Sequence, residues 1–257
     1  MTNDIQDLLA RGVEEIHVQE HLESALTAGR KLRVKHGIDP TGAKLHLGHA
    51  ATLWKLREFQ DLGHQVVIII GDYTAQIGDP SDKLAKRPFL SEDAVKENMK
   101  SYQEQLGKIL DLAKVEFRFN SEWLTKLSMR QLDELADIFT IQQMIERRNF
   151  HERIEKGEEI SLRELHYPLY QGYDSVAVQA DVEVGGTDQL FNLLAGRKIQ
   201  DAYGQAAQDV MTTSMLLGLD GNKMSKTAGN TINILDMAQD MYGKVMSLRD
   251  ALIPDYF

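Results

Sequence analysis

Two histidines stand three residues apart in "DPTGAKLHLGHA" (residues 39–50), where an Asp-Pro-Thr-Gly turn leads into a helical pattern. Residues three apart lie on one face of a helix, so His46 and His49 can point at one ligand. The pair could bind a metal, exchange protons, donate hydrogen bonds to an anion at the helix N-terminus, or simply be solvated. A metal site needs further ligands, and no cluster of His, Asp or Glu with ligand spacing lies nearby.

A second motif with chemical potential lies near the end of the sequence, in "GLDGNKMSKTAGN" (218–230). Lys223, Lys226 and the hydroxyl of Thr227 form a cationic, glycine-rich loop that suits a polyphosphate. The alternative is an ordinary solvated surface loop. The usual phosphate-binding fingerprints G-x-x-x-x-G-K-[ST] and G-x-G-x-x-G do not occur in the sequence.

A polar stripe in "YPLYQGYD" suggests a binding surface on a helix. Tyr167, Gln171 and Asp174 fall at i, i+4 and i+7, on one side of a helix that also carries apolar residues. A buried polar group left without a partner costs about 1–3 kcal/mol. The stripe therefore faces either water or a polar ligand, and the spacing alone leaves both open.

A glycine pair in "VGGTDQLFN" allows a close backbone approach to a ligand. Gly185 and Gly186 have no side chain to obstruct it. Thr187 and Asp188 follow them and are also good caps for the next helix.

The elements that must position these residues alternate between strands and helices. Strands are predicted at 31–38, 65–70, 115–120, 180–186 and 210–219, and helices at 2–29, from 47 to about 62, from 91 onward, throughout 121–157 and from about 187. The run "QVVIII" is typical of a strand buried on both faces of a parallel sheet. The capping boxes "SMRQ" (128–131) and "SLRE" (161–164) mark two helix starts. We expect an α/β fold with a parallel sheet and a helical insertion at about 121–165.

Composition excludes several classes of protein. The 257 residues include no cysteine, so disulfides and thiolate metal sites are excluded. A formal net charge of −10 argues against a chain that coats nucleic acid with lysine. No run of about 18 apolar residues predicts a membrane span, and the acidic N-terminus does not resemble a signal peptide, so a cytoplasmic location is expected.

Taken together, the motifs resemble a known family. "HLGH" followed by "KMSKT" is similar to the paired signatures of class I aminoacyl-tRNA synthetases. The motifs "GIDPTGAKLHLGH", "IGDPSDKLAKR", "YPLYQGYDS", "VGGTDQLFN" and "GLDGNKMSKT" narrow the resemblance to bacterial-type tyrosyl-tRNA synthetases, from about residue 30 to the end. The resemblance implies a Rossmann-like nucleotide-binding sheet, and residues 1–257 are expected to form a catalytic domain without the family's C-terminal anticodon-binding region.

The resemblance also implies an activity and assigns residues to it. L-Tyrosine would react with ATP to give tyrosyl-adenylate, and tyrosine would then pass to tRNA(Tyr). The nucleophile is already a carboxylate, so the histidines would donate hydrogen bonds rather than shuttle protons. The implied catalytic residues are Thr41, His46, His49, Lys223, Lys226 and Thr227. The implied ATP-binding residues are Gly37, Asp39, Gly48, Lys83, Arg87, Gly186, Asp188 and Met224. The implied tyrosine-binding residues are Lys35, Asp79, Tyr167, Gln171, Asp174 and Gln189.

Further expectations concern partners and cofactors. Mg²⁺ would enter with ATP, without a dedicated protein metal site and without a tightly bound cofactor. The insertion, including Leu162, is similar to the family's dimer interface, so a symmetric homodimer is expected, with no membrane association.

The sequence departs from the family pattern at four positions and leaves alternatives open. Lys35 stands where many members have a tyrosine that binds the substrate phenol, His36 where a small residue is frequent, and Asp82 where a glycine is usual. Thr227 stands in place of a serine and keeps the hydroxyl. The alternatives are a tryptophanyl-tRNA synthetase, another nucleotidyltransferase of the same HxGH superfamily, or a non-catalytic RNA-binding paralogue.

Overall fold

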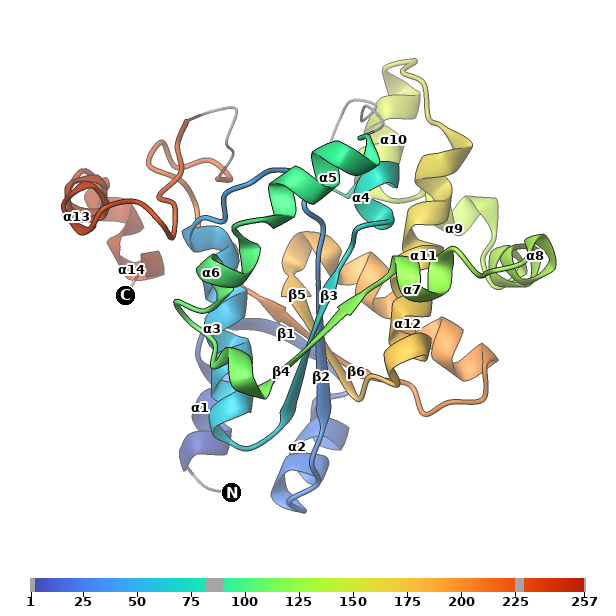
Figure 1. Ribbon diagram of the computed structural model, residues 1–257, viewed down its shortest axis with the longest axis horizontal. Coiled ribbons are helices and arrows are strands. Elements are labelled where there is room, and N and C mark those ends of the chain that lie inside the picture. Colours follow the sequence, from blue (N-terminus) through green and yellow to red (C-terminus); the bar gives the residue numbers. More distant parts are fainter. Residues whose placement is uncertain (1–2, 82–89, 225–228, 257) are drawn as a thin grey trace.

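The protein is built on one six-stranded sheet, seen edge-on at the centre of Figure 1. The computed structural model describes residues 3–81, 90–224 and 229–256. The strand order is β1-β6-β5-β2-β3-β4, with β1 antiparallel to β6 and all other pairs parallel. The strands are β1 (Val13–His17), β2 (Arg33–Ile38), β3 (Gln65–Ile70), β4 (Val115–Phe119), β5 (Val182–Gly186) and β6 (Asp209–Thr213). The predicted α/β fold with a mostly parallel sheet is confirmed.

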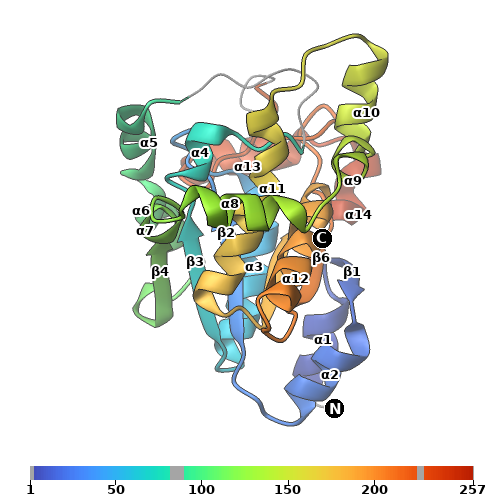
Figure 2. The ribbon, with the colours of Figure 1, turned by 90° about the vertical axis from the view of Figure 1, so that its right-hand side faces the viewer.

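Helices cover both faces of the sheet, and further short helices lie around its carboxyl edge (Figures 1 and 2). The α-helices are α1 (Asn3–Ala10), α2 (Gln19–Thr27), α3 (Leu47–Asp61), α4 (Thr74–Ile77), α5 (Glu92–Met99), α6 (Tyr102–Leu106), α7 (Ser121–Leu124), α8 (Met129–Asp137), α9 (Ile141–Ile145), α10 (Arg148–Glu155), α11 (Leu162–Val178), α12 (Leu190–Ala202), α13 (Ala238–Met246) and α14 (Ile253–Tyr256). The 3₁₀ turns are η1 (Leu112–Lys114), η2 (Thr187–Gln189) and η3 (Asp250–Leu252). No helix in these described ranges is long and apolar enough to cross a membrane.

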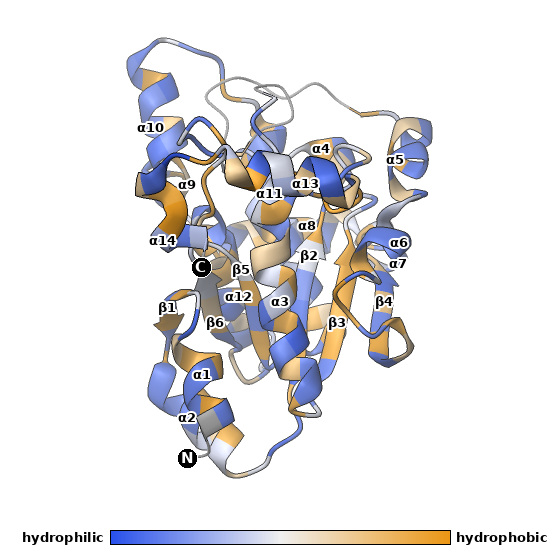
Figure 3. Cartoon of the chain, turned by 90° about the vertical axis from the view of Figure 1, so that its left-hand side faces the viewer, coloured by the Kyte–Doolittle hydropathy of each residue, from blue (hydrophilic) through white to orange (hydrophobic). Residues whose placement is uncertain are grey.

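Strand β3 shows why the sheet is buried on both sides. Val66 and Ile68 pack with α3 residues in one core cluster, whereas Val67 and Ile69 pack with Val178 at the end of α11 in another. Successive side chains of a strand point to opposite faces, so a continuous apolar run serves both layers. Strand β3 is orange along its length in Figure 3, in keeping with this continuous apolar run.

Strand connectivity places a switch point between β2 and β5. From β2 the chain adds β3 and β4 on one side, and later adds β5 and β6 on the other. Between β4 and α11 it forms the four short helices α7 to α10, within the segment expected to be an insertion. Crevices at such switch points, at the carboxyl ends of the strands, are the usual ligand sites of open parallel sheets.

The prediction of one helix over 2–29 was wrong. Gly12 (φ 64°) ends α1, and the following residues pair as β1 with β6. Helical periodicity cannot reveal this, because the strand is specified by a partner about 200 residues later. The predicted helix end at Gly29 is confirmed by its left-handed conformation (φ 69°) after α2.

Three other element predictions need adjustment. The helix expected from Ser91 is split into α5 and α6, although Ser91 does cap α5 by accepting a hydrogen bond from Ala94 N. The strand expected over 210–219 ends at Thr213, where its partner β5 also ends. The helix expected at Thr187 begins as the 3₁₀ turn η2 before α12.

Candidate active site

A cavity of about 290 Å³ opens at the carboxyl edge of the sheet, beside β2, β5 and β6. It is lined by these described site residues from the sequence analysis: Gly37, Asp39, Thr41, His46, Gly48, His49, Asp79, Tyr167, Gln171, Asp174, Gly186, Asp188, Gln189, Lys223 and Met224. Lys35 is not among the lining residues. Lys83, Arg87, Lys226 and Thr227, together with Asp82, lie outside the described residues.

The start of α3 brings the two histidines together. Their ring centroids are 4.0 Å apart, and His49 Nδ1 accepts a hydrogen bond from the backbone N–H of His46. Neutral His49 therefore carries its proton on Nε2 and is a donor there. A side chain at Gly48 would place its Cβ 3.1 Å from the His46 ring, so glycine allows this close arrangement. Within the described ranges, no group of three His, Asp or Glu side chains is arranged to hold a metal ion.

Asp174, on α11, is a buried carboxylate with two side-chain donors. Its Oδ1 accepts from the Trp123 indole nitrogen at 2.8 Å, and its Oδ2 accepts from Asn120 Nδ2 at 3.3 Å. Burial raises the pKa of Asp174 to about 7, while the nearby charge of Lys35 acts in the opposite direction. A carboxyl group with this pKa changes protonation state near neutral pH.

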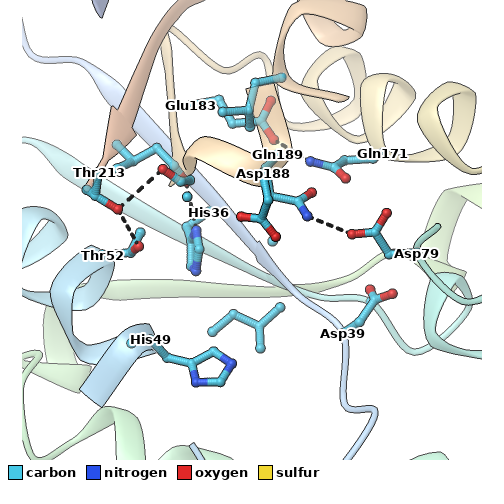
Figure 4. Close-up of a pocket in the computed structure, with 18 of the residues that line it drawn as sticks. His36, Asp39, His49, Thr52, Asp79, Gln171, Glu183, Asp188, Gln189 and Thr213 are labelled. Atoms are coloured by element: carbon cyan, nitrogen blue, oxygen red, sulfur yellow. Dashed lines mark hydrogen bonds between the residues drawn. The ribbon is translucent and has the colours of Figure 1, made fainter. Parts of the chain in front are cut away.

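A second acidic cluster joins β2, α4 and α11. Asp39 Oδ2 accepts from the Tyr167 hydroxyl at 3.0 Å, and Asp39 Oδ1 accepts from Thr74 Oγ1 at 2.7 Å. Asp79 accepts from Gln189 Nε2 at 2.6 Å (Figure 4). Burial raises the pKa of Asp39 to about 7, and the charge of Asp79 adds to the shift. The cluster therefore concentrates negative charge that favours a cationic group of a ligand.

The opposite side of the pocket carries hydroxyl and imidazole groups. Thr52 Oγ1 and Thr213 Oγ1 are 2.9 Å apart, and Thr213 also donates to Gly185 O (Figure 4). His36 Nδ1 lies 2.7 Å from Val184 O; a carbonyl only accepts, so this nitrogen carries the proton. Burial lowers the pKa of His36 and favours the neutral ring.

The glycine-rich lysine loop reaches this side of the pocket. Lys223 Nζ is 2.9 Å from Asp188 Oδ2. Asp188 also lies close to the backbone at Gly186, where a Cβ would come within 2.7 Å of its Oδ1. The two sequence motifs that carry Asp188 and Lys223 therefore meet at one ion pair.

Lys35 occupies a position different from the expected one. Its Nζ donates to Gln171 O at 2.9 Å and to Ser175 Oγ at 2.8 Å, and pairs with Glu183 Oε1 at 2.9 Å. These three contacts match the three N–H groups of an ammonium. The side chain is fully buried, so its described contacts indicate a position behind the pocket wall rather than on it.

Sequence reasoning did not single out several residues of the pocket and its surroundings: Thr52, Asn120, Trp123, Glu183 and Thr213. A signal was available for one of them. Asn120 is the last residue of the predicted strand 115–120, at the edge where such sheets bind ligands. Glu183 and Thr213 lie inside their predicted strands, so their place at the pocket follows only from the strand bounds and register of the structure. Trp123 and Thr52 carry no such signal, because each lies within a helix.

Comparison with known proteins places the chain in a family. The model of the family "tRNA synthetases class I (W and Y)" matches residues 27–257. A tyrosine--tRNA ligase from Thermotoga maritima is 53% identical over 250 residues, and one from Carboxydothermus hydrogenoformans is 51% identical over 255 residues. Each alignment covers 97% of this chain, which spans 62% of the length of the relative.

Solved structures show the same fold. A tyrosyl-tRNA synthetase from Archaeoglobus fulgidus, crystallised with L-tyrosine, matches with a TM-score of 0.77 at 25% identity, covering 95% of this chain and 75% of that one. The enzyme from Aeropyrum pernix matches with a TM-score of 0.76 at 21% identity, covering 96% and 73%. Since the family model spans nearly the whole chain, the protein belongs to the class I tRNA synthetases of the tryptophan and tyrosine type.

Proposed function

We infer that this chain activates L-tyrosine with ATP, forming tyrosyl-adenylate and pyrophosphate, and that it transfers tyrosine to tRNA(Tyr). The observation that carries this proposal is the presence of two acidic sites in one cavity, one formed by the buried Asp174 and the other by the half-buried Asp79 and Asp39. Such a pair fits a ligand with a phenol at one end and an ammonium at the other. The names of the relatives support tyrosine over tryptophan.

Tyrosine recognition would divide between these two sites. Asp174, held in place by Trp123 and Asn120, would accept the phenolic O–H. The ammonium would bind among Asp79, Gln171 and Tyr167, whose hydroxyl donates its hydrogen to Asp39 and so presents its oxygen lone pairs as acceptors. Gln189, hydrogen-bonded to Asp79, would lie near the reacting end of tyrosine.

The chemical step would rely on positioning and charge. An oxygen of the tyrosine carboxylate attacks the α-phosphorus of ATP, and the bond from that phosphorus to the bridging oxygen breaks as pyrophosphate leaves. His46 and Thr41 would donate to the leaving phosphates, and Lys223 would neutralise the charge that develops on them. Interactions of this kind accelerate the reaction when they are stronger in the transition state than in the bound substrates.

The nucleotide would occupy the side of the cavity nearest to α3 and β5. His49 Nε2 and Asp188 are suited to ribose hydroxyls, with Gly186 permitting a close approach. Mg²⁺ would enter as part of the ATP substrate and be held by its phosphates. Lys83, Arg87, Lys226 and Thr227 complete the proposed phosphate-binding set.

The proposal includes a homodimer acting in the cytoplasm. Large apolar side chains are exposed at the starts of α8, α9 and α11, namely Met129, Ile141 and Leu162, with Leu162 75% exposed. Exposed apolar surface of this kind favours burial against a second copy. The lack of cysteine is in keeping with a reducing compartment.

Amino-acid binding tests the proposal directly. Equilibrium dialysis of the purified chain against labelled tyrosine, tryptophan and phenylalanine is expected to show saturable binding of tyrosine alone. Preference for tryptophan would overturn the assignment of substrate within the family. Charging of tRNA(Tyr) transcripts under the same conditions tests the transfer step separately.

A further inference from the structure

A buried ion pair joins Lys35, behind the pocket wall, to Glu183, which lines the cavity. Lys35 on β2 and Glu183 on β5 are paired residues of neighbouring parallel strands, and their side chains are 0% and 1% exposed. Burying two charges is costly unless all their hydrogen-bonding groups are satisfied.

Glu183 is surrounded by donors only. Its Oε1 is contacted by Lys35 Nζ at 2.9 Å and by Gln171 Nε2 at 3.3 Å. Its Oε2 is contacted by Ser175 Oγ at 3.2 Å and by Gln208 Nε2 at 2.5 Å. A carboxylate accepts at both oxygens, so it satisfies all four donors at once.

Both members of the ion pair contact Gln171. Lys35 donates to its backbone carbonyl, and Glu183 accepts from its side-chain amide (Figure 4). The amide group can be turned in two ways, and only the NH₂ can face a carboxylate. Glu183 therefore directs the nitrogen of Gln171 to itself. Among the described residues none donates to Gln171 Oε1, which leaves this oxygen to a ligand in the cavity.

We propose that the Lys35–Glu183 pair is a positioning device that fixes the amide of Gln171 with its oxygen available to the substrate ammonium. With the amide reversed, an NH₂ group would face the ammonium and no acceptor would be offered. Lys35 serves the pair by neutralising Glu183 and by fixing the backbone of α11 at Gln171. The family resemblance assigns Lys35 to direct contact with the substrate phenol. In this proposal Lys35 acts instead on the ammonium end of the substrate.

The inference rests on the proposed tyrosine binding and is tested with two ligands. L-Tyrosine has the ammonium, and 3-(4-hydroxyphenyl)propanoate lacks it but keeps the phenol and the carboxylate. Dissociation constants of both are measured for the wild-type chain and for Glu183→Gln. Glutamine keeps one acceptor oxygen, which can serve either Lys35 and Gln171 or Ser175 and Gln208, so the orientation of Gln171 is imposed in only one of its two amide orientations.

The expected result is a loss of tyrosine affinity of about 10- to 100-fold, the effect of losing a hydrogen bond to a charged group. The affinity of the propanoate is expected to change by less than about threefold, because it makes no contact that requires the Gln171 oxygen. Glu164→Gln is the matched control: it breaks a second fully buried ion pair, Arg153–Glu164, away from the cavity, and is expected to leave both constants unchanged.

A second variant separates positioning from stability. Lys35→Met/Glu183→Met replaces both charges with apolar side chains, a change that buried ion pairs often tolerate. It is expected to fold, as measured by its thermal midpoint, and to lose the same affinity for tyrosine as Glu183→Gln.

An equal loss for both ligands, or no loss for tyrosine in either variant, would overturn the positioning role while leaving the proposed function intact. A wild-type chain that binds no tyrosine would refute the proposed function itself, and the inference with it.

Discussion

Lys223 Nζ lies 2.9 Å from Asp188 Oδ2, which joins the lysine-bearing loop near the end of the chain to the turn after β5. Both residues line the cavity, on the side assigned to ATP. When the nucleotide binds, Asp188 would exchange this partner for ribose hydroxyls and release Lys223 to the phosphates. The ion pair thereby holds the cation close to the place where negative charge develops.

Replacement of Lys223 is expected to slow adenylate formation without affecting tyrosine binding. Lys223→Met removes one cation from the leaving pyrophosphate, and loss of one such group typically costs about 10²–10³ in rate. The affinity for tyrosine should stay within about twofold, because Lys223 is on the ATP side. Single-turnover kinetics and dialysis measure the two quantities, and Lys223→Arg is the charge-preserving control. A loss of tyrosine affinity as large as the loss of rate would contradict the division of the pocket into a tyrosine side and an ATP side.

Asp174 is predicted to decide between tyrosine and phenylalanine. Asp174→Asn keeps the size of the side chain but weakens its role as acceptor for a phenol. Tyrosine affinity is expected to fall about 10- to 100-fold, with little change for phenylalanine. Competition binding of the two amino acids to wild type and variant measures the ratio. If phenylalanine binding fell in parallel, the variant would be disturbing the pocket generally.

Tyrosine affinity is predicted to depend on pH near neutrality. The pKa of Asp174 is raised to about 7, so the free protein holds a proton there below pH 7 and loses it above. Only the ionised form accepts the phenolic O–H well, so affinity should rise with pH. Between pH 6 and 8 the rise is expected to be about tenfold.

Titration calorimetry across this range measures the dependence, and two variants locate its source. Asp174→Asn should remove the part of the slope that Asp174 causes. Asp39→Asn should keep the part of the slope that Asp174 causes and remove only the part added by ionisation of Asp39, whose pKa burial also raises to about 7. If the affinity of the wild type does not change with pH, or if Asp39→Asn abolishes the change, ionisation of Asp174 is not its source.

The proposed dimer should depend on Leu162. A charge at this 75% exposed position, in Leu162→Glu, would be buried without a partner in a symmetric interface. The variant is expected to be monomeric by light scattering at concentrations where the wild type is dimeric. Tyr242→Glu on α13, also an exposed large apolar position, is the matched control and should not alter the mass. Equal masses for wild type and Leu162→Glu would show that Leu162 does not lie in a dimer interface.

Local periodicity was sufficient to predict much of the sheet and α3. The run 65–70 forms β3, and the helical pattern after His46 forms α3 with nearly the predicted end. The N-terminal region could not be predicted in this way, because β1 exists only by pairing with β6 at the sheet edge. Its few apolar residues fit a helix equally well until that partner is known.

The candidate site likewise combines residues that local spacing predicts with residues that only long-range contacts bring into place. The spacing of Tyr167, Gln171 and Asp174 placed them on one helical face, and all three do line the cavity. The position of Lys35 depends on the register of β2 with β5, which brings it opposite Glu183. No local pattern contains that register. Trp123 is similarly hidden, because its contact with Asp174 joins segments about 50 residues apart.

The most direct test of the proposed adenylation activity is the exchange of labelled pyrophosphate into ATP by the purified chain, with tyrosine, tryptophan or phenylalanine as the amino acid. Exchange requires both halves of the cavity to work together in reversible adenylate formation. Exchange is expected with tyrosine, and none is expected with the other two. Exchange driven by tryptophan, or none with any amino acid in a folded sample that binds tyrosine and ATP, would contradict the proposed activity.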